Sequence, residues 1–221
     1  MSSSFRFIFI ALLGASVFAA AACSSPAETF KKCKASRCEA LSSGFAKRIC
    51  NDMCEKRAYG DFDDEKLAKL CKGGDDQACL RGANLAFKNK DAAALVSNLD
   101  IGCGRGCAEC CGMLGKAYRR GVVVKRDKPK GYVLMEKGCT LGNVSACASP
   151  ALNYLLTKKY DKAKVLFTKG CDGGAKMSCG MLGVMYRDGK GVPLDLAKAK
   201  ALLRKSCKLG NKTACKAALR I

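Results

Sequence analysis

The chain contains 17 cysteines among its 221 residues, and their spacing is the feature that could carry chemistry. Ten of them form five pairs in which seven residues separate the two members. Paired cysteines can form disulfides, bind a metal or act as redox couples. Five copies of one spacing favour a disulfide with the same structural role in each copy. The pairs are Cys71/Cys79, Cys103/Cys111, Cys139/Cys147, Cys171/Cys179 and Cys207/Cys215.

The cysteine pairs recur at a nearly fixed period. The first cysteines of successive pairs lie 32, 36, 32 and 36 residues apart, and a period in this range indicates a stack of structural repeats. Each pair surrounds a turn that contains glycine, as at 209–211. We therefore expect the first cysteine in the last turn of one helix and the second in the opening turn of the next. Their α-carbons would then lie within disulfide range, about 4.4 to 6.8 Å.

Apolar residues between the cysteines define the repeated unit. In segments 176–189 and 194–207 they recur every three or four residues, which predicts two amphipathic helices. The glycine-rich segment between them also contains a proline and cannot continue a helix. The first and third copies are four residues shorter and join their helices through 88–90 and 157–159. We predict an all-α solenoid of about four αα-hairpins over residues 59–221, held by disulfides.

One pair of cysteines departs from the repeat. Cys107 and Cys110 form a Cys-x-x-Cys motif beside Cys111 and one helical turn after Cys103. Three interpretations remain open: a structural bridge within or next to the Cys103/Cys111 corner, a redox couple, or a metal site. The βαβ pattern expected around this motif in a thioredoxin fold is absent. The disulfide partners of Cys107 and Cys110 do not follow from the sequence.

Four further cysteines precede the repeats. Cys33 and Cys38 come before a Ser-Ser-Gly turn, and Cys50 and Cys54 follow it, among residues that favour helices. Two antiparallel helices with nested bridges Cys33–Cys54 and Cys38–Cys50 fit this order, although four cysteines allow three connectivities. A zinc site is the alternative, which an oxidising compartment and the lack of histidine disfavour. We expect residues 23–58 to form a cysteine-stapled helical cap on the array.

The start of the chain predicts export. Residues 1–22 combine a basic residue, a short apolar run and small residues, as in a signal peptide. Cys23 follows three alanines, which resembles a bacterial lipobox and predicts a lipid anchor at Cys23. Without Cys23 the cysteines number sixteen, which can all pair. Ser24 favours the outer membrane over the inner one, by resemblance to proteobacterial lipoproteins; the alternative is ordinary cleavage and a secreted protein.

The chain is strongly basic. It has 40 Lys and Arg against 19 Asp and Glu, and loss of the signal peptide would leave a net charge of +20 (39 − 19). Such a field attracts polyanions, although the lysines can also simply solvate the outer faces of amphipathic helices. For an exported, monomeric chain we expect an envelope protein, a peptide or an anionic cell-wall polymer as partner, and no nucleic acid. Membrane contact is expected only through the N-terminal lipid.

The fullest copy of the repeat, 171–207, reads Cys, seven residues, Cys, Leu-Gly, Tyr, Gly-x-Gly-Val-Pro, Asp and Lys-Ala. This pattern resembles the Sel-like repeat, which is related to tetratricopeptide repeats, and its disulfide-bridged branch, the exported cysteine-rich Hcp family of bacteria. The resemblance covers about 160 of the 221 residues. It implies a right-handed α-solenoid with a concave surface and a role as an adaptor or binding module. Some members of that branch are described as penicillin-binding proteins or weak β-lactamases.

The residues do not supply the usual chemistry of a β-lactamase. A serine enzyme of that type needs Ser-x-x-Lys, Ser-Asp-Asn and Lys-Thr-Gly; none occurs, and the nearest approaches are Ser43 with Lys47 and the run Lys-Thr-Ala at 212–214. A chain without histidine also lacks Ser-His-Asp and Cys-His arrangements. We assign no catalytic residue, cofactor or metal. The expected function is a non-catalytic scaffold that binds a protein, peptide or cell-wall ligand, with β-lactam hydrolysis as the alternative.

Three tyrosines, Tyr118, Tyr154 and Tyr186, each lie seven residues after a repeat cysteine. Aromatic residues at one register can line a ligand groove or pack between adjacent helices, and both interpretations remain open. Glycines close to the same cysteines are expected to allow close contacts between helices. They match no phosphate-binding loop.

Overall fold

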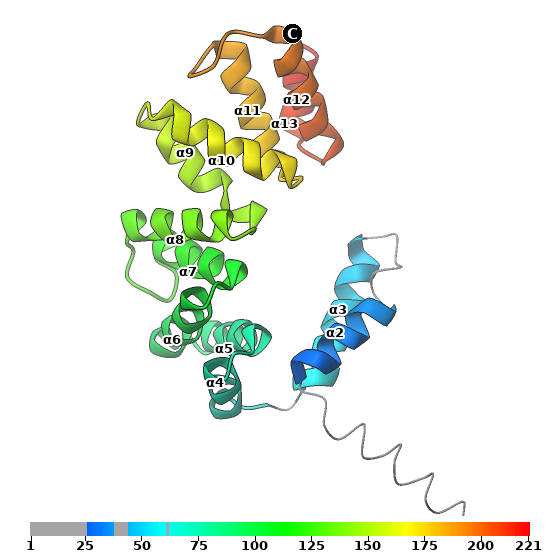
Figure 1. Ribbon diagram of the computed structural model, residues 1–221, viewed down its shortest axis with the longest axis vertical. Coiled ribbons are helices and arrows are strands. Elements are labelled where there is room, and N and C mark those ends of the chain that lie inside the picture. The colour runs from blue at the N-terminus through cyan, green and yellow to red at the C-terminus, as the bar shows by residue number, and fades with distance from the viewer. Residues whose placement is uncertain (1–25, 38–43, 61) are drawn as a thin grey trace, which may run out of the picture. The chain divides into compact units, whose positions relative to one another are not determined.

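Figure 1 shows the computed structural model, which describes residues 26–37, 44–60 and 62–221. Helices make up the regular structure, and no strand occurs in these ranges. The predicted signal peptide, Cys23 and Cys38 lie outside the described residues. None of the described helices combines the length and apolar character that a membrane span requires. The chain divides into two units between residues 66 and 67, and each is described by itself.

The first unit contains two helices that pack against each other, α2 (Pro26–Arg37) and α3 (Gly44–Tyr59). Cys33 of α2 is bridged to Cys54 of α3, with α-carbons 5.6 Å apart. Cys50 is also disulfide-bonded, while the partner predicted for it lies outside the described residues. Cys54 is buried, so the bridge occupies a position that an apolar side chain would otherwise fill.

The second unit is a stack of helical hairpins (Figure 1), which confirms the predicted all-α solenoid. Each helix packs mainly against its neighbours along the chain, as in a quasi-one-dimensional array. The leading helix is α4 (Asp64–Lys72), the hairpins are α5/α6 (Asp76–Lys88, Ala92–Gly104), α7/α8 (Ala108–Arg120, Lys128–Thr140), α9/α10 (Ala148–Leu156, Tyr160–Asp172) and α11/α12 (Lys176–Asp188, Leu196–Lys208), and the closing helix is α13 (Lys212–Ala218).

Side chains at the helix starts explain where the helices begin. Asn211 accepts a hydrogen bond from a backbone amide in the first turn of α13. Each such cap satisfies an amide that the helix itself leaves unpaired and is worth about 1 kcal/mol. In α7 the cap is a cysteine, Cys107. Aspartates cap four helices in the same way: Asp75 on α5, Asp91 on α6, Asp127 on α8 and Asp195 on α12.

The loops within the hairpins have two lengths. In the longer loops, α7 and α11 end at Gly121 and Gly189, whose φ values of 71° and 65° suit a residue without a β-carbon. The shorter loops reverse the chain at Lys90 and Lys158, with φ values of 56° and 58°. The alternating period of 32 and 36 residues therefore reflects loop length, while the helices keep their positions in the stack.

The third hairpin starts differently from the prediction. Residues Val144–Ala146 form a 3-10 turn, η1, and α9 begins only at Ala148, after Cys147. Pro150 explains the late start, because it has no amide hydrogen and its ring collides with the carbonyl four residues earlier. The expectation that every second cysteine lies inside the opening turn of an α-helix is wrong for Cys147.

Glycines set the distance between the two helices of the longer hairpins. A β-carbon at Gly115 would lie 2.7 Å from the carbonyl oxygen of Gly131, and one at Gly131 would lie 2.7 Å from the backbone nitrogen of Arg119. In the fourth hairpin, a β-carbon at Gly183 would lie 3.2 Å from the carbonyl oxygen of Ala199. Backbone atoms cannot move aside as a flexible side chain can, so α7 and α8 approach each other at a distance that only glycine permits.

Candidate functional site

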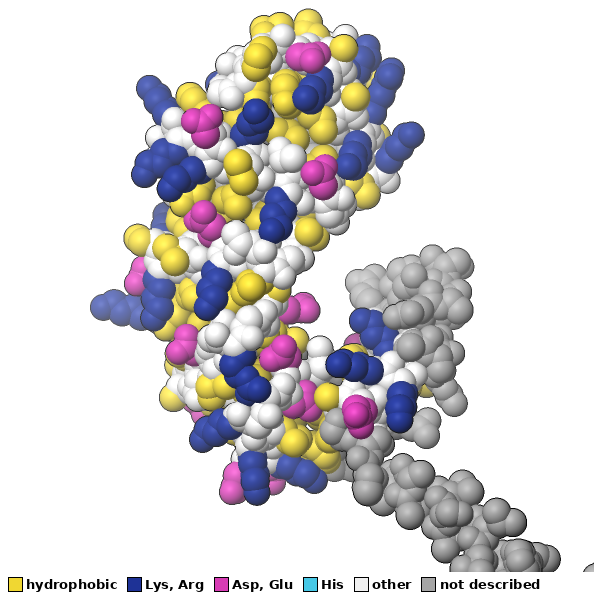
Figure 2. All heavy atoms as spheres, viewed as in Figure 1, with side chains coloured by type: hydrophobic (Ala, Val, Ile, Leu, Met, Phe, Trp, Pro, Cys, Tyr) yellow, Lys and Arg dark blue, Asp and Glu magenta, His cyan; other side chains and the backbone are white. Residues whose placement is uncertain are grey.

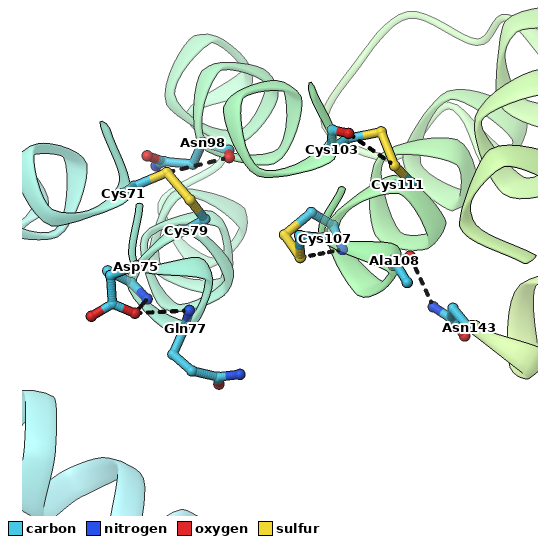
Figure 3. Close-up of a disulfide and its surroundings, with 12 residues drawn as sticks. Cys71, Asp75, Gln77, Cys79, Asn98, Cys103, Cys107, Ala108, Cys111 and Asn143 are labelled. Carbon is cyan, nitrogen blue, oxygen red and sulfur yellow. Dashed lines mark hydrogen bonds between the residues drawn. A yellow bond between two sulfur atoms is a disulfide. The ribbon is translucent and has the colours of Figure 1, made fainter. Parts of the chain in front are cut away.

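Five disulfides lie where α4 or a hairpin ends and the next helix begins; we call these positions corners. Figure 3 shows two of these disulfides. The first cysteine of each is the penultimate residue of its helix. The α-carbons of each pair are 4.4 to 4.8 Å apart. The structure pairs Cys71 with Cys79, Cys103 with Cys111, Cys139 with Cys147, Cys171 with Cys179 and Cys207 with Cys215.

The corner bridges are structural elements. The cysteines of the first four are at most 2% exposed, and those of the last are half-buried. The sulfur of Cys71 lies 3.6 Å from the carbonyl oxygen of Asn98 in α6 (Figure 3), so this corner also packs against the following hairpin. A bridge closing so short a loop contributes at most about 3 kcal/mol. The number of disulfides in the structure indicates an oxidising, extracytoplasmic environment.

Cys107 and Cys110 are bridged to each other, with α-carbons 5.3 Å apart. Cys107 is the N-cap of α7, and its sulfur accepts a hydrogen bond from the backbone amide of Cys110 at 3.1 Å (Figure 3). Cys107 is 6% exposed and Cys110 is fully buried. The bridge therefore joins two residues of a single helical turn. Within the described ranges, no group of three or more cysteine or acidic side chains is placed to hold a metal ion.

An apolar pocket of about 180 Å³ opens between α5, α6 and α7. Leu95 and Leu99 of α6 are its buried residues, while Phe87 of α5 is 49% exposed. Two basic residues of α7, Lys116 and Arg120, lie in the lining, which contains no acidic residue. The remaining lining residues are Met113, Ala117 and Val122.

This pocket does not follow from the spacing of the apolar residues in the sequence. Phe87 lies eight residues after the second cysteine of its corner, and the corresponding residues in the other copies are Arg119, Leu155 and Arg187. The signal available in the sequence was a phenylalanine at a position that is arginine in both longer copies. Alignment of the copies with one another would have shown it, whereas the helical period alone does not.

Two of the predicted tyrosines pair with a lysine from the other helix of their hairpin. The ammonium group of Lys130 lies 4.2 Å from the ring centroid of Tyr118, and that of Lys198 lies 4.3 Å from the ring centroid of Tyr186. Hydrogen bonding to the phenol oxygen raises the pKa of Lys130 and of Lys198 above the ordinary lysine value. These tyrosines therefore connect the helices on either side of a long loop.

The third tyrosine connects two hairpins. Tyr154 of α9 donates a hydrogen bond to Oε2 of Glu136 in α8, at 2.7 Å. This bond, together with partial burial, raises the pKa of Tyr154. The three tyrosines thus make contacts between helices, and none of them lies in the lining of the apolar pocket.

Basic residues are scattered over the face shown in Figure 2, but they are concentrated on α12. The second helices of the hairpins can be compared at five partly or fully exposed positions equally spaced from their corner cysteines. The formal charge of this set is −1 on α6, 0 on α8, +1 on α10 and +4 on α12. The α12 positions border a hollow of about 870 Å³. The sets are Val96, Ser97, Asp100, Ile101 and Gly104; Tyr132, Val133, Glu136, Lys137 and Thr140; Lys164, Val165, Thr168, Lys169 and Asp172; and Lys200, Ala201, Arg204, Lys205 and Lys208.

Comparison with known proteins identifies the repeat. The family model described as Sel1 repeat matches residues 108–143 and 177–211, which correspond to the two longer hairpins with their following corners. A search of the curated proteins found no match. The family match therefore rests on the two longer copies of the repeat.

Two solved structures show the same fold. One is c5321, a protective antigen of uropathogenic Escherichia coli strains that displays an SLR fold; it is 20% identical, with a TM-score of 0.61 over 70% of this chain and 35% of that chain. The other is a Sel1 repeat protein from Oxalobacter formigenes, 22% identical, with a TM-score of 0.64 over 91% of this chain and 67% of that chain. The chain thus spans about a third of the length of the first structure and two thirds of the second. The two longer hairpins thus match the Sel1 repeat, and the second unit as a whole is an all-α solenoid whose hairpins are joined by disulfides.

Proposed function

We propose that this protein is an exported, lipid-anchored scaffold whose solenoid binds an acidic protein or peptide segment at the pocket between α5, α6 and α7. Stacked helical repeats commonly present extended binding surfaces. The observation that carries the proposal is an apolar pocket that opens to solvent beside Lys116 and Arg120. An apolar side chain flanked by carboxylates would complement both its lining and its charge.

The size of the pocket favours a side-chain anchor over a small-molecule ligand. Ligand pockets usually measure about 300 to 1,000 Å³, and this one measures about 180 Å³. Interfaces often depend on one aromatic or aliphatic residue that fills a pocket of this kind. Phe87 at the pocket edge would then be covered by the partner.

Fluorescence anisotropy with two matched peptides tests this site. Both peptides carry a central Leu-Phe pair, one flanked by Glu and Asp and the other by Lys. We expect the acidic peptide to bind more tightly, and Phe87→Ala to weaken its binding by about 5- to 30-fold, equivalent to about 1 to 2 kcal/mol. Leu156→Ala is the control, because Leu156 is also an exposed apolar residue, at 74%, and lies outside the pocket. Equal losses in both variants would contradict the proposal.

Export and lipid anchoring rest on residues 1–23, with support from the disulfides of the described part. Mass spectrometry of the protein from membranes is expected to show an N-terminal diacylglyceryl group on Cys23. Cys23→Ser should release the protein in soluble form. An unmodified N-terminus in the membrane fraction would exclude the anchor.

The α12 surface supports a second candidate, binding of a linear anionic polymer. Lys200, Arg204 and Lys208 follow one another at intervals of four residues, which is about 6 Å along a helix. Like charges at this spacing destabilise an isolated helix by about 0.2 to 0.5 kcal/mol per pair. No acidic residue occurs between residues 196 and 221, although the ammonium group of Lys200 donates a hydrogen bond to the oxygen of Ile221 at 3.2 Å. A chain of phosphate or carboxylate groups lying across the hollow would remove this repulsion.

The salt dependence of polyphosphate binding tests the second candidate. Replacing Lys200, Arg204 and Lys208 by Glu should flatten the slope of log K against log salt by about 2, at about 0.7 per lost contact with a single-stranded polyanion. The control makes the same charge change at exposed lysines of other helices and loops: Lys90, Lys158 and Lys162. The same slope change in both triple variants would show a general field effect and refute an α12 site.

β-Lactam hydrolysis rests on the family resemblance alone. Of the nearest approaches to the serine β-lactamase motifs, Ser43 lies outside the described residues, and residues 212–214 form the first turn of α13. We expect no turnover of a chromogenic cephalosporin by the purified protein. Turnover above a mock preparation would replace the scaffold proposal by an enzymatic one.

A further inference from the structure

We propose that the Cys107–Cys110 disulfide is a thiol–disulfide exchange site that takes two electrons from a partner dithiol, while the five corner bridges remain closed. The partner is a protein or peptide with two nearby thiols. This inference is independent of the pocket and of the α12 surface.

The position of the bridge allows it to open without loosening the solenoid. Each corner bridge ties the end of one helix to the start of the next, whereas Cys107 and Cys110 both belong to the start of α7. When this bridge opens, Cys103–Cys111 still joins α6 to α7 (Figure 3). The fold can therefore survive reduction at this position.

Stability does not account for the bridge. The entropy that a disulfide removes from the unfolded chain falls with the length of the closed loop, and these cysteines are only three residues apart. The loop of the Cys103–Cys111 corner already contains both residues. A cap for α7 needs no cysteine, because in the first corner the same two positions are Asp75, which caps α5, and Ala78.

The geometry favours the reduced form of Cys107. Its sulfur stands at the N-terminus of α7 and accepts the amide hydrogen of Cys110 at 3.1 Å. A negative charge at this end of a helix is stabilised by the helix dipole and by the unpaired amides of the first turn. Cysteines in this position of a Cys-x-x-Cys motif form thiolates readily, and stabilising the reduced form makes the disulfide a stronger oxidant.

The exchange balances in two steps. A partner thiolate attacks the Cys107 sulfur, which is the more exposed of the two; the Cys107–Cys110 bond breaks, and Cys110 leaves as a thiolate and takes up a proton. The second partner thiolate then attacks the partner sulfur of the mixed disulfide. Cys107 leaves as a thiolate held by the Cys110 amide. The partner gains one disulfide, and the protein gains two thiols.

Stepwise reduction provides the test. The oxidised protein is equilibrated with increasing dithiothreitol, its free thiols are alkylated, and the modified cysteines are mapped by mass spectrometry. We expect a species with exactly two thiols, at Cys107 and Cys110, and with unchanged helical circular dichroism. The Cys207–Cys215 bridge is the internal control, because it is also partly exposed but joins two helices. Reduction of Cys207–Cys215 before, or together with, Cys107–Cys110 would overturn the proposal.

A matched variant tests the transfer itself. The double change Cys107→Asp and Cys110→Ala copies the residues of the first corner and keeps a side-chain cap on α7. A reduced peptide with two cysteines serves as the electron donor. The wild-type protein should oxidise one equivalent of this peptide, and the variant should oxidise none while unfolding at a similar temperature. Equal peptide oxidation by both proteins would assign the reaction to another bridge and refute the proposal.

Discussion

Val123 and Gly191 occupy equivalent positions in the two long loops and share a φ of 68°. A left-handed conformation costs a residue with a β-carbon about 1 to 2 kcal/mol. A β-branched residue such as valine is rarely found in this conformation. Glycine avoids this strain, but it gives the unfolded chain more conformational entropy, which lowers the free energy of unfolding by about 0.4 to 1 kcal/mol. We therefore predict that Val123→Gly raises the free energy of unfolding by about 0.5 to 1 kcal/mol.

The opposite change should be harmful for two reasons. Gly191→Val introduces the left-handed strain, and its β-carbon would overlap the β-carbon of Tyr160. We predict a loss of about 2 to 4 kcal/mol. Tyr160→Gly, which removes the overlapping β-carbon, should recover at least about 1 kcal/mol of the loss caused by Gly191→Val, which is a coupling expected only of residues in contact.

Thermal unfolding of the oxidised proteins by circular dichroism measures all four combinations at positions 160 and 191. For a domain of this size, 1 kcal/mol shifts the melting temperature by about 2 to 4 °C. A lower melting temperature for Val123→Gly would show that packing of the valine outweighs its strain. Additive effects of Gly191→Val and Tyr160→Gly would refute the proposed overlap.

Two further changes test contacts between helices. Tyr154→Phe should cost about 0.5 to 1 kcal/mol by removing the bond to Glu136. Because the pKa of Tyr154 is raised in the folded state, the contribution of Tyr154 to the free energy of unfolding is complete below the ordinary tyrosine pKa. This contribution is lost as the pH rises through the raised pKa. Urea unfolding across the alkaline range should show the loss in the wild-type protein but not in Tyr154→Phe. Gly131→Ala should lower stability by about 2 kcal/mol or more because its β-carbon would meet the backbone of Arg119. A β-carbon at Gly104 would meet open space, so Gly104→Ala should instead raise the free energy of unfolding by about 0.5 to 1 kcal/mol. Changes of the same sign in Gly131→Ala and Gly104→Ala would contradict the close approach of α7 and α8.

The helices and corners were predictable because local signals encode them. A capping aspartate such as Asp195, a glycine such as Gly189 and the cysteine spacing each act within a few residues of their own position. Pro150 was visible in the sequence as well, but its effect on α9 depends on where the helix would otherwise have begun. The prediction is wrong there because the spacing of the cysteines does not report the local effect of a proline on the start of a helix.

The pocket was not predictable from periodicity because three helices contribute to it. Leu99 looks like an ordinary core residue of α6, and Met113 looks like one of α7. Only the stacking of α5, α6 and α7 brings them beside Phe87 and leaves a space between them. The pairing of Cys107 with Cys110 was likewise not predictable, because Cys103 and Cys111 lie within four residues of Cys107 and are alternative disulfide partners.

The copies of a repeat act as internal controls for one another. Residues that agree between copies are explained by the fold they share, such as the corner cysteines, the capping aspartates and the close-contact glycines. Phe87, the Cys107–Cys110 pair and the basic row on α12 have no such explanation, and two of them work against stability: Phe87 exposes apolar area, and the α12 row places like charges together. Phe87→Arg, which copies the longer repeats, should therefore preserve the melting temperature within about 2 °C while abolishing peptide binding at the pocket. A large loss of stability would instead show that Phe87 contributes to packing, and this result would contradict the assignment of the pocket as the binding site.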